Sequence, residues 1–62
     1  MQCYLRQKRM EKHLTQKDLA RILNMNVTQL SKIEKGHVLP RVDTALRIAH
    51  ALGVAVEDVW VI

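Results

Sequence analysis

Apolar residues along this chain recur at helical spacing in several short runs. Leu19, Ile22 and Leu23 stand at positions i, i+3 and i+4, which places them on one face of a helix. Leu30 and Ile33 repeat the i, i+3 spacing further along. The clearest period follows residue 41 and is carried by Val42, Ala45, Leu46, Ala49 and Leu52. The pattern predicts an all-α protein whose short helices each bury one apolar face.

Capping residues set the bounds of the two central helices. Thr15 is a good N-cap, and Asp18 three residues later completes a capping-box pattern. Asn24 tolerates the left-handed conformation that ends a helix. Asn26 follows almost at once as the N-cap of the next helix, with Gln29 at the box position. Two capped helices joined by so short a turn are the signature of a helix-turn-helix.

Three further helices complete the predicted bundle. The first spans about Cys3 to Lys12 and has a weak period, and the last spans about Val56 to Trp60. His37 to Pro40 form a loop ahead of the fourth helix. We therefore expect residues 1–62 to form one domain, a compact bundle of five short helices, with the helix-turn-helix at about 15–35.

Charge along the chain is uneven. Residues 1–41 hold nine Lys or Arg against three Asp or Glu, whereas residues 42–62 hold one against three. The first part is therefore polarised towards a polyanion. The helix of about 27–35 exposes Thr, Gln, Ser and Lys, all able to hydrogen-bond to DNA, and its one carboxylate, Glu34, falls nearer the apolar face. Such a helix can lie in a major groove about 12 Å wide.

Several other classes of function lack support. The single cysteine, Cys3, rules out an internal disulfide and fits a reducing cytoplasm. Basic residues interrupt the N-terminal apolar stretch, and no segment approaches the roughly 18 apolar residues of a membrane span. His13, His37 and His50 share no ligand spacing, so we expect no metal and no cofactor. One serine, no glycine-rich loop and no carboxylate pair make an enzyme the weakest alternative.

The chain also resembles the Cro-like helix-turn-helix (XRE) family, which includes lambdoid phage repressors. LTQKDL from Leu14 to Leu19 is similar to the opening of the family's first motif helix, and SKIEKG from Ser31 to Gly36 to the end of its recognition helix. ALGV from Ala51 to Val54 matches its junction between the last two helices. Departures are Asn24 and His13 in place of glycines. The resemblance implies a lambda-repressor-like fold and a cytoplasmic, nucleoid-associated transcriptional regulator, expected to be a repressor.

The motif helices supply the candidate DNA contacts. We expect base edges to be read by Val27, Thr28 and Lys32, and phosphates to be held by Thr15, Gln16, Lys17, Gln29 and Lys35, with Asn26 among the DNA-binding residues. Val27 stands where polar base-reading residues are common in the family. The alternatives without DNA contact are a packing role for Val27, lysines that are only solvated, and capping roles for Thr28 and Gln29. The resemblance also implies an ion pair between Arg9 and Glu34.

Dimerisation is the remaining expectation. One recognition helix reads too few base pairs to single out a genomic site, so two copies are expected on a palindrome. The apolar C-terminal residues offer an interface, namely Val59, Trp60, Val61 and Ile62. Alternatively, Val56, Val59 and Trp60 cap the monomer's own core. The competing functions are an antitoxin or bridging module that binds a protein partner, with or without DNA, and an RNA-binding protein.

Overall fold

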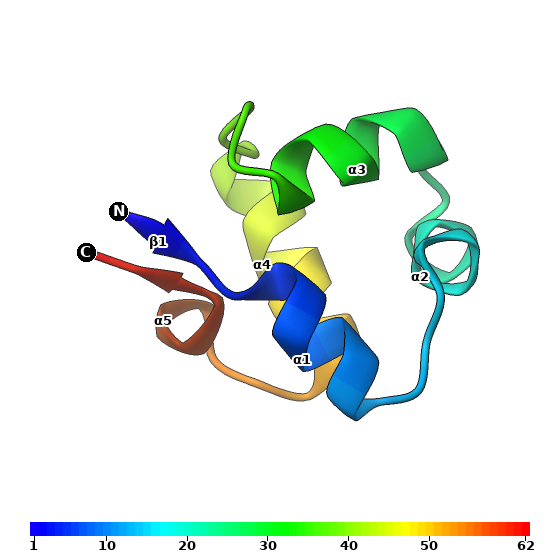
Figure 1. Cartoon of the computed structure of the whole chain (residues 1–62), viewed down its shortest axis with the longest axis horizontal. Coiled ribbons are helices and arrows are strands. Elements are labelled where there is room, and N and C mark those ends of the chain that lie inside the picture. The colour runs from blue at the N-terminus through cyan, green and yellow to red at the C-terminus, as the bar shows by residue number, and fades with distance from the viewer.

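The structure is a computed structural model that describes residues 1–62, and its elements follow the predicted order of five helices. These are α1 (Leu5–Glu11), α2 (Gln16–Leu23), α3 (Val27–Glu34), α4 (Val42–Leu52) and α5 (Val56–Val59). Figure 1 shows α2 almost end-on beside α3, so the two motif helices cross steeply. The all-α class and the five-helix architecture are confirmed. None of the helices is long and apolar enough to cross a membrane.

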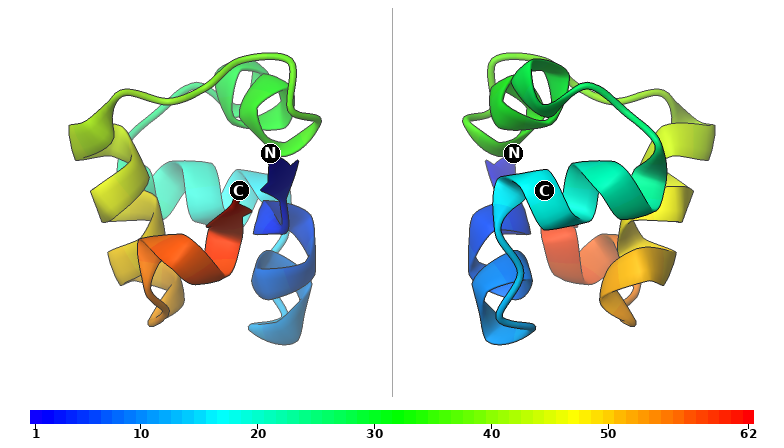
Figure 2. Two further views of the ribbon diagram at one scale, coloured as in Figure 1. Left: turned by 90° about the vertical axis from the view of Figure 1, so that its left-hand side faces the viewer. Right: turned by 90° about the vertical axis from the view of Figure 1, so that its right-hand side faces the viewer.

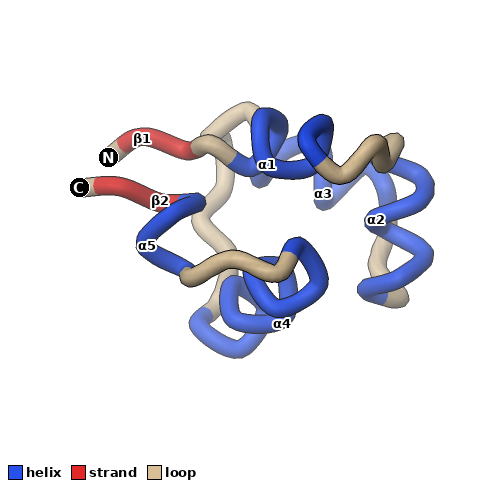
Figure 3. Tube along the Cα trace, turned by 90° about the horizontal axis from the view of Figure 1, so that it is seen from below, coloured by secondary structure: helices blue, strands red, loops and turns tan.

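The two ends of the chain differ from the prediction. Cys3 and Trp60, expected inside helices, pair with each other in a small antiparallel sheet formed by β1 (Gln2–Cys3) and β2 (Trp60–Val61). The Tyr4 amide extends this contact by donating to the Val59 carbonyl at 2.7 Å. The sheet joins segments almost the whole chain apart, which Figure 3 shows side by side. Helical periodicity describes neighbours in sequence only, so it does not predict this pairing.

Nine buried side chains form the core, and all five helices contribute to it: Leu5, Leu19, Ala20, Leu23, Leu30, Ile33, Ile48, Leu52 and Val59. Cys3, Leu14, Met25 and Trp60 are among the half-buried residues packed against it. The core is aliphatic, and α2 packs against both α3 and α4. This packing sets the position of α3 relative to α2, which the short turn alone does not determine.

Three residues predicted to face inward lie at the surface instead. Ile22, Val42 and Leu46 are 58%, 77% and 56% exposed. On α4 the buried face contains Ile48, Ala49 and Leu52. Leu46 precedes Ile48 by two residues, or about 200° around a helix, so the two cannot both face the core. Sequence spacing identified a helix but placed part of its buried face wrongly.

Candidate nucleic-acid interface

The start of α2 is held by a complete capping box. The Asp18 amide donates to the Thr15 hydroxyl oxygen at 3.0 Å, and the Thr15 amide donates to the Asp18 carboxylate at 3.0 Å. Hydrogen bonding to the Asp18 carboxylate, from the Thr15 backbone amide first and the Thr15 side chain second, lowers the pKa of Asp18 below its ordinary value. The capping box predicted here is therefore confirmed. It orders the end of α2 that carries the exposed Thr15 and Lys17.

A three-residue turn joins α2 to α3. Asn24 adopts the left-handed conformation at φ 55°, as its place in the sequence predicted, and Met25 packs against the core. The Asn26 side chain caps α3 by accepting from the Thr28 amide at 2.7 Å. The reciprocal bond expected from Gln29 is not formed, so this N-terminus has a single side-chain cap. Because both ends of the turn are bonded, α3 starts in one defined direction.

The two faces of α3 are sharply different. Leu30 and Ile33 are buried, at 0% and 1% exposure. The outer face carries the exposed residues predicted to contact DNA, which are Val27, Thr28, Gln29, Lys32 and Lys35 at the helix end. The predicted helix-cap residue Asn26 is exposed beside them. This outer surface presents hydroxyl, amide and ammonium groups, and no carboxylate.

Glu34 is withdrawn from that surface by an ion pair with Arg9. The Arg9 Nε lies 2.9 Å from Glu34 Oε2, and its Nη2 lies 3.0 Å from Oε1, a bidentate arrangement. The two side chains are only 11% and 4% exposed. The Arg9 Nη1 also donates to the Leu14 carbonyl at 2.7 Å. The pair thus joins α1, the loop before α2 and the end of α3.

Gln16 belongs to the same network. Its amide nitrogen donates to Glu34 Oε1 at 3.2 Å, so that oxygen accepts hydrogen bonds from two helices. Gln16 was predicted only as a phosphate contact, and the sequence does not indicate this second partner. Nor does it indicate the contact of Arg47 in α4, whose guanidinium donates to the Leu23 carbonyl at the end of α2. Both contacts join residues at least 18 positions apart, and no local pattern indicates them.

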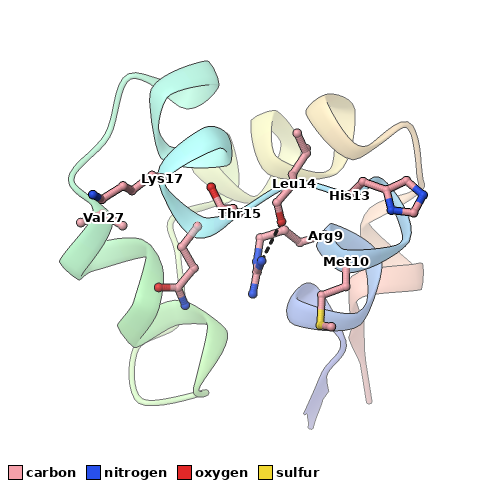
Figure 4. A pocket seen from close by; sticks show the side chains of 8 residues that line it. Arg9, Met10, His13, Leu14, Thr15, Lys17 and Val27 are labelled. Carbon is pink, nitrogen blue, oxygen red and sulfur yellow. Dashed lines mark hydrogen bonds between the residues drawn. The ribbon is translucent and has the colours of Figure 1, made fainter.

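Residues of α2 and α3 that were predicted to contact DNA line one open hollow. Thr15, Gln16, Lys17 and Val27 form part of its wall, together with Arg9, Met10, His13 and Leu14. Figure 4 shows Lys17 and Val27 at one side, Met10 and His13 at the other, and the Arg9–Leu14 bond between them. His13 adopts φ 58°, which suits the position where the family has glycine. The first turn of α2 and the first residue of α3 therefore share one surface.

The C-terminal residues separate into three environments. Val59 is fully buried in the monomer core, so the structure corrects its assignment to a dimer interface. Trp60 is half-buried against that core. Val61 and Ile62 are exposed, at 41% and 109%. Since alternate residues of a strand point to opposite faces, Trp60 and Val61 do not form one continuous apolar surface.

Comparison with known proteins identifies the family. A helix-turn-helix family model matches residues 5–59. The ImmF control region 10 kDa protein of Bacillus phage phi105 is 49% identical over 45 residues, 73% of this chain and 50% of that protein. An uncharacterized HTH-type transcriptional regulator of Methanocaldococcus jannaschii is 39% identical over 49 residues, 79% of this chain and 74% of the relative. The chain thus spans half the length of the phage relative and about three quarters of the archaeal one.

The match covers the capped turn, α3 and the core that holds them together. The relatives' names describe a control-region protein and a transcriptional regulator rather than an enzyme. The chain therefore belongs to the helix-turn-helix family, and its fold is that of a DNA-binding domain.

Proposed function

We propose that this protein binds double-stranded DNA sequence-specifically and regulates transcription by placing α3 in the major groove. The proposal rests on the exposed face of α3, because this face presents hydrogen-bond donors and acceptors and two lysines. The one acidic side chain of the helix is buried against Arg9 and does not repel phosphate. The resemblance to lambdoid repressors favours repression as the outcome, and DNA binding would place the protein in the cytoplasm with the nucleoid.

The contacts divide between bases and backbone. Val27, Thr28 and Lys32 occupy the exposed face of α3 and are assigned to base edges; a thymine methyl would suit Val27. Phosphate contacts are assigned to Thr15, Gln16, Lys17, Gln29 and Lys35. The side-chain oxygen of Asn26 accepts the hydrogen bond that caps α3. Its side-chain N–H groups are left to contact the DNA backbone. The Glu34 bond holds Gln16 beside the start of α2, where helix N–H groups also favour an anion.

The proposed functional species is a homodimer. An eight-residue helix can reach only a few base pairs, whereas a genome offers roughly 10⁶ or more competing sites. Two copies with recognition helices about 34–36 Å apart would read both halves of a palindrome. Among the C-terminal residues predicted to join the copies, Trp60, Val61 and Ile62 remain accessible enough to contribute.

Selection of preferred sites from a random duplex pool tests the proposal. We expect a palindromic consensus whose binding weakens as salt rises, because phosphate contacts release counterions. The selected duplex should bind better than its single strands or the RNA duplex of the same sequence. Enrichment of no duplex, or equal binding to RNA, would contradict sequence-specific DNA recognition.

A protein-interaction module of the antitoxin or bridging type is the second candidate. Exposed apolar residues around the loop after α3, including Leu39 and Val42, favour it. This reading predicts a stable complex with another protein under conditions where the random-pool selection fails. If the selection succeeds, any protein partner would act in addition to DNA.

A further inference from the structure

His13 stands in the loop between α1 and α2 and lines the open hollow that also contains Lys17 and Val27. The right panel of Figure 2 faces this side of the molecule, where the loop from α1 leads up to the start of α2 and α3 lies above α2. Figure 4 shows the imidazole at the edge of the hollow, on the side opposite Lys17. The volume of the hollow is about 720 Å³, which is enough for a sugar–phosphate segment of one DNA strand.

The His13 side chain has no partner within the folded chain. It is exposed, and it makes no hydrogen bond and no ion pair with another residue. Its backbone has the left-handed conformation, at φ 58°, which glycine adopts without steric cost. Because the family has glycine at this position, the imidazole is a feature of this chain rather than of the family. It adds a polar group to the hollow that is free to contact a ligand.

The charges of the hollow favour an anion. No Asp or Glu lines it, and the charged residues that do are Arg9 and Lys17. Arg9 is paired with Glu34, so Lys17 supplies most of the positive charge. The nearby Asp18 is bonded in the capping box at the start of α2. An anion in the hollow would therefore meet the Lys17 ammonium on one side and the His13 imidazole on the other.

The charged neighbours of His13 at the end of α1 have other partners. Glu11 Oε1 lies 3.9 Å from Lys8 Nζ on the same helix. The Lys12 ammonium lies 3.8 Å from where a Cβ of Gly53 would stand, at the end of α4. No carboxylate of the chain is therefore bonded to the imidazole, and a protonated His13 is available to pair with a phosphate.

The hollow also borders the path of a DNA strand next to α3. With α3 in the major groove, Val27 at its start faces a base edge, and Gln16 and Lys17 reach phosphates at the border of the groove. These three residues share the hollow with His13. His13 therefore borders the same run of phosphates from the opposite side. Contacts of this kind fix the register of a protein on a duplex.

We propose that the protonated imidazole of His13 binds a backbone phosphate of the DNA, across the hollow from Lys17. The inference rests on the proposed function and extends its contact surface to the loop between α1 and α2. Histidine side chains in general change charge between pH 5 and 8, and only the protonated form is a cation with two N–H donors. Because the phosphate binds this form, the affinity for DNA rises as the pH falls through this range.

Binding at two pH values tests the proposal. The wild-type protein and His13→Asn are titrated with a duplex selected by the wild type, at about pH 5.5 and about pH 8 and at constant ionic strength. Asparagine is neutral and tolerates the left-handed conformation, so the variant keeps the backbone of the loop. His50→Gln is the matched control, because His50 is also exposed but lines another hollow on α4. His37→Gln, in the loop after α3, is a second control, and melting temperatures check that each variant is folded.

We expect the wild type and both controls to bind about tenfold more tightly at the lower pH, since a charge-assisted contact forms only there. His13→Asn should lose most of this gain and match the wild type at the higher pH. At the lower pH its salt slope should be smaller than that of the wild type by about one, because one phosphate fewer is neutralised. A purely structural role of His13 would lower the affinity at both pH values alike.

Two results would overturn the proposal. One is an equal pH dependence in His13→Asn and the wild type. The other is a pH dependence that disappears in His37→Gln or His50→Gln and persists in His13→Asn. Failure of the wild type to select any duplex would instead reject the proposed DNA-binding function itself.

Neutralising single phosphates locates the contact. Uncharged methylphosphonate linkages are placed one at a time in a duplex that holds one half of the selected site. At one position the pH dependence of the wild type should disappear, because the protonated imidazole no longer meets a charge there. His13→Asn should show little change between the two pH values at the same position. A pH dependence of the wild type that persists at every position would contradict a direct contact between His13 and a phosphate.

Discussion

The surface of α2 and α3 and the surface around the start of α4 expose opposite kinds of side chain. On the first, apolar residues such as Leu30 turn inward, and the exposed residues are polar or basic. On the second, Leu39 and Val42 remain exposed and the nearest charges form a weak pair beside them. The first surface suits a hydrated polyanion and the second an apolar partner. One small domain thus has two faces with different chemistry.

The faces also differ in how they are held. Around α3 a buried network of Arg9, Glu34 and Gln16 joins three helices with hydrogen bonds of 2.9 to 3.2 Å. Around the start of α4 the N-cap residue Arg41 makes no side-chain cap. Precise placement of donors is needed to read base edges, whereas an apolar contact tolerates adjustment. The following predictions address this difference, from the largest expected effect to the smallest.

Breaking the buried ion pair should have the largest effect. Glu34→Gln leaves the Arg9 charge buried without its counter-charge, and we expect a loss of about 3–5 kcal/mol in the free energy of unfolding. The double variant Arg9→Met with Glu34→Leu should recover much of this loss, because no unpaired charge remains. Urea unfolding followed by circular dichroism measures both. A loss below about 1 kcal/mol would mean that the pair acts as an exposed one.

Shortening a side chain on the buried side of α4 should reduce the free energy of unfolding far more than shortening one on its exposed side. Ile48→Ala should cost about 2–5 kcal/mol because Ile48 is fully buried. Leu46→Ala should change the free energy of unfolding by less than about 1 kcal/mol, since Leu46 is 56% exposed. The thermal unfolding of the two variants under one set of conditions provides the comparison. Equal losses would show that Leu46 contributes to the core.

The two lysines of the α3 face should differ in their effect on DNA binding. Lys32→Ala should lose about 1–3 kcal/mol at one base pair and relax sequence preference there, as expected for a base contact. Lys35→Ala should weaken binding to all duplexes alike and reduce the salt slope by about one. Binding to the selected duplex and its single-base variants, over a range of salt, distinguishes them. Losses that are equal and independent of sequence in both variants would reject this assignment.

Removing the capping-box carboxylate should have the smallest effect, and the resulting loss of stability should depend on pH. The pKa of Asp18 is lowered in the folded protein by its bonds with Thr15, so the ionised carboxylate favours folding. This contribution is complete above the unfolded pKa of about 3.9 and is lost as the pH falls through the lower folded pKa. Asp18→Asn should therefore reduce the melting temperature at neutral pH more than in strong acid. A difference that stays constant with pH would exclude this role of the carboxylate.

Much of the half formed by α2 and α3 could be predicted from the sequence because its signals are local. Thr15 with Asp18 and the turn residue Asn24 act within a few positions of themselves, and the structure has them as expected. Leu30 and Ile33 stand at i, i+3 and are buried, so the residues on the opposite side of α3 face outward. The resemblance to a known family supplied the expectation of an Arg9–Glu34 pair, which spacing alone does not indicate.

Less of the other half could be predicted, because its features depend on which segments meet. Val42 and Leu46 have helical spacing, yet the rotation of α4 against α2 decides that Ile48 faces the core in place of Leu46. The same packing brings the chain ends together, where Cys3 pairs with Trp60 and the helices stop short of both. Val59 then fills the core and is lost to any interface.

By itself the sequence determined the helix-turn-helix, its caps and the polar character of α3, since each depends on residues within a few positions of one another. Only the tertiary structure decided that Gln16 is bonded to Glu34. It also decided that Leu39, Val42 and Trp60 line an apolar groove beside the start of α4. These features arise where helices distant in sequence pack, and their contacts depend on the rotation and position of whole elements. Local periodicity contains no information on either quantity.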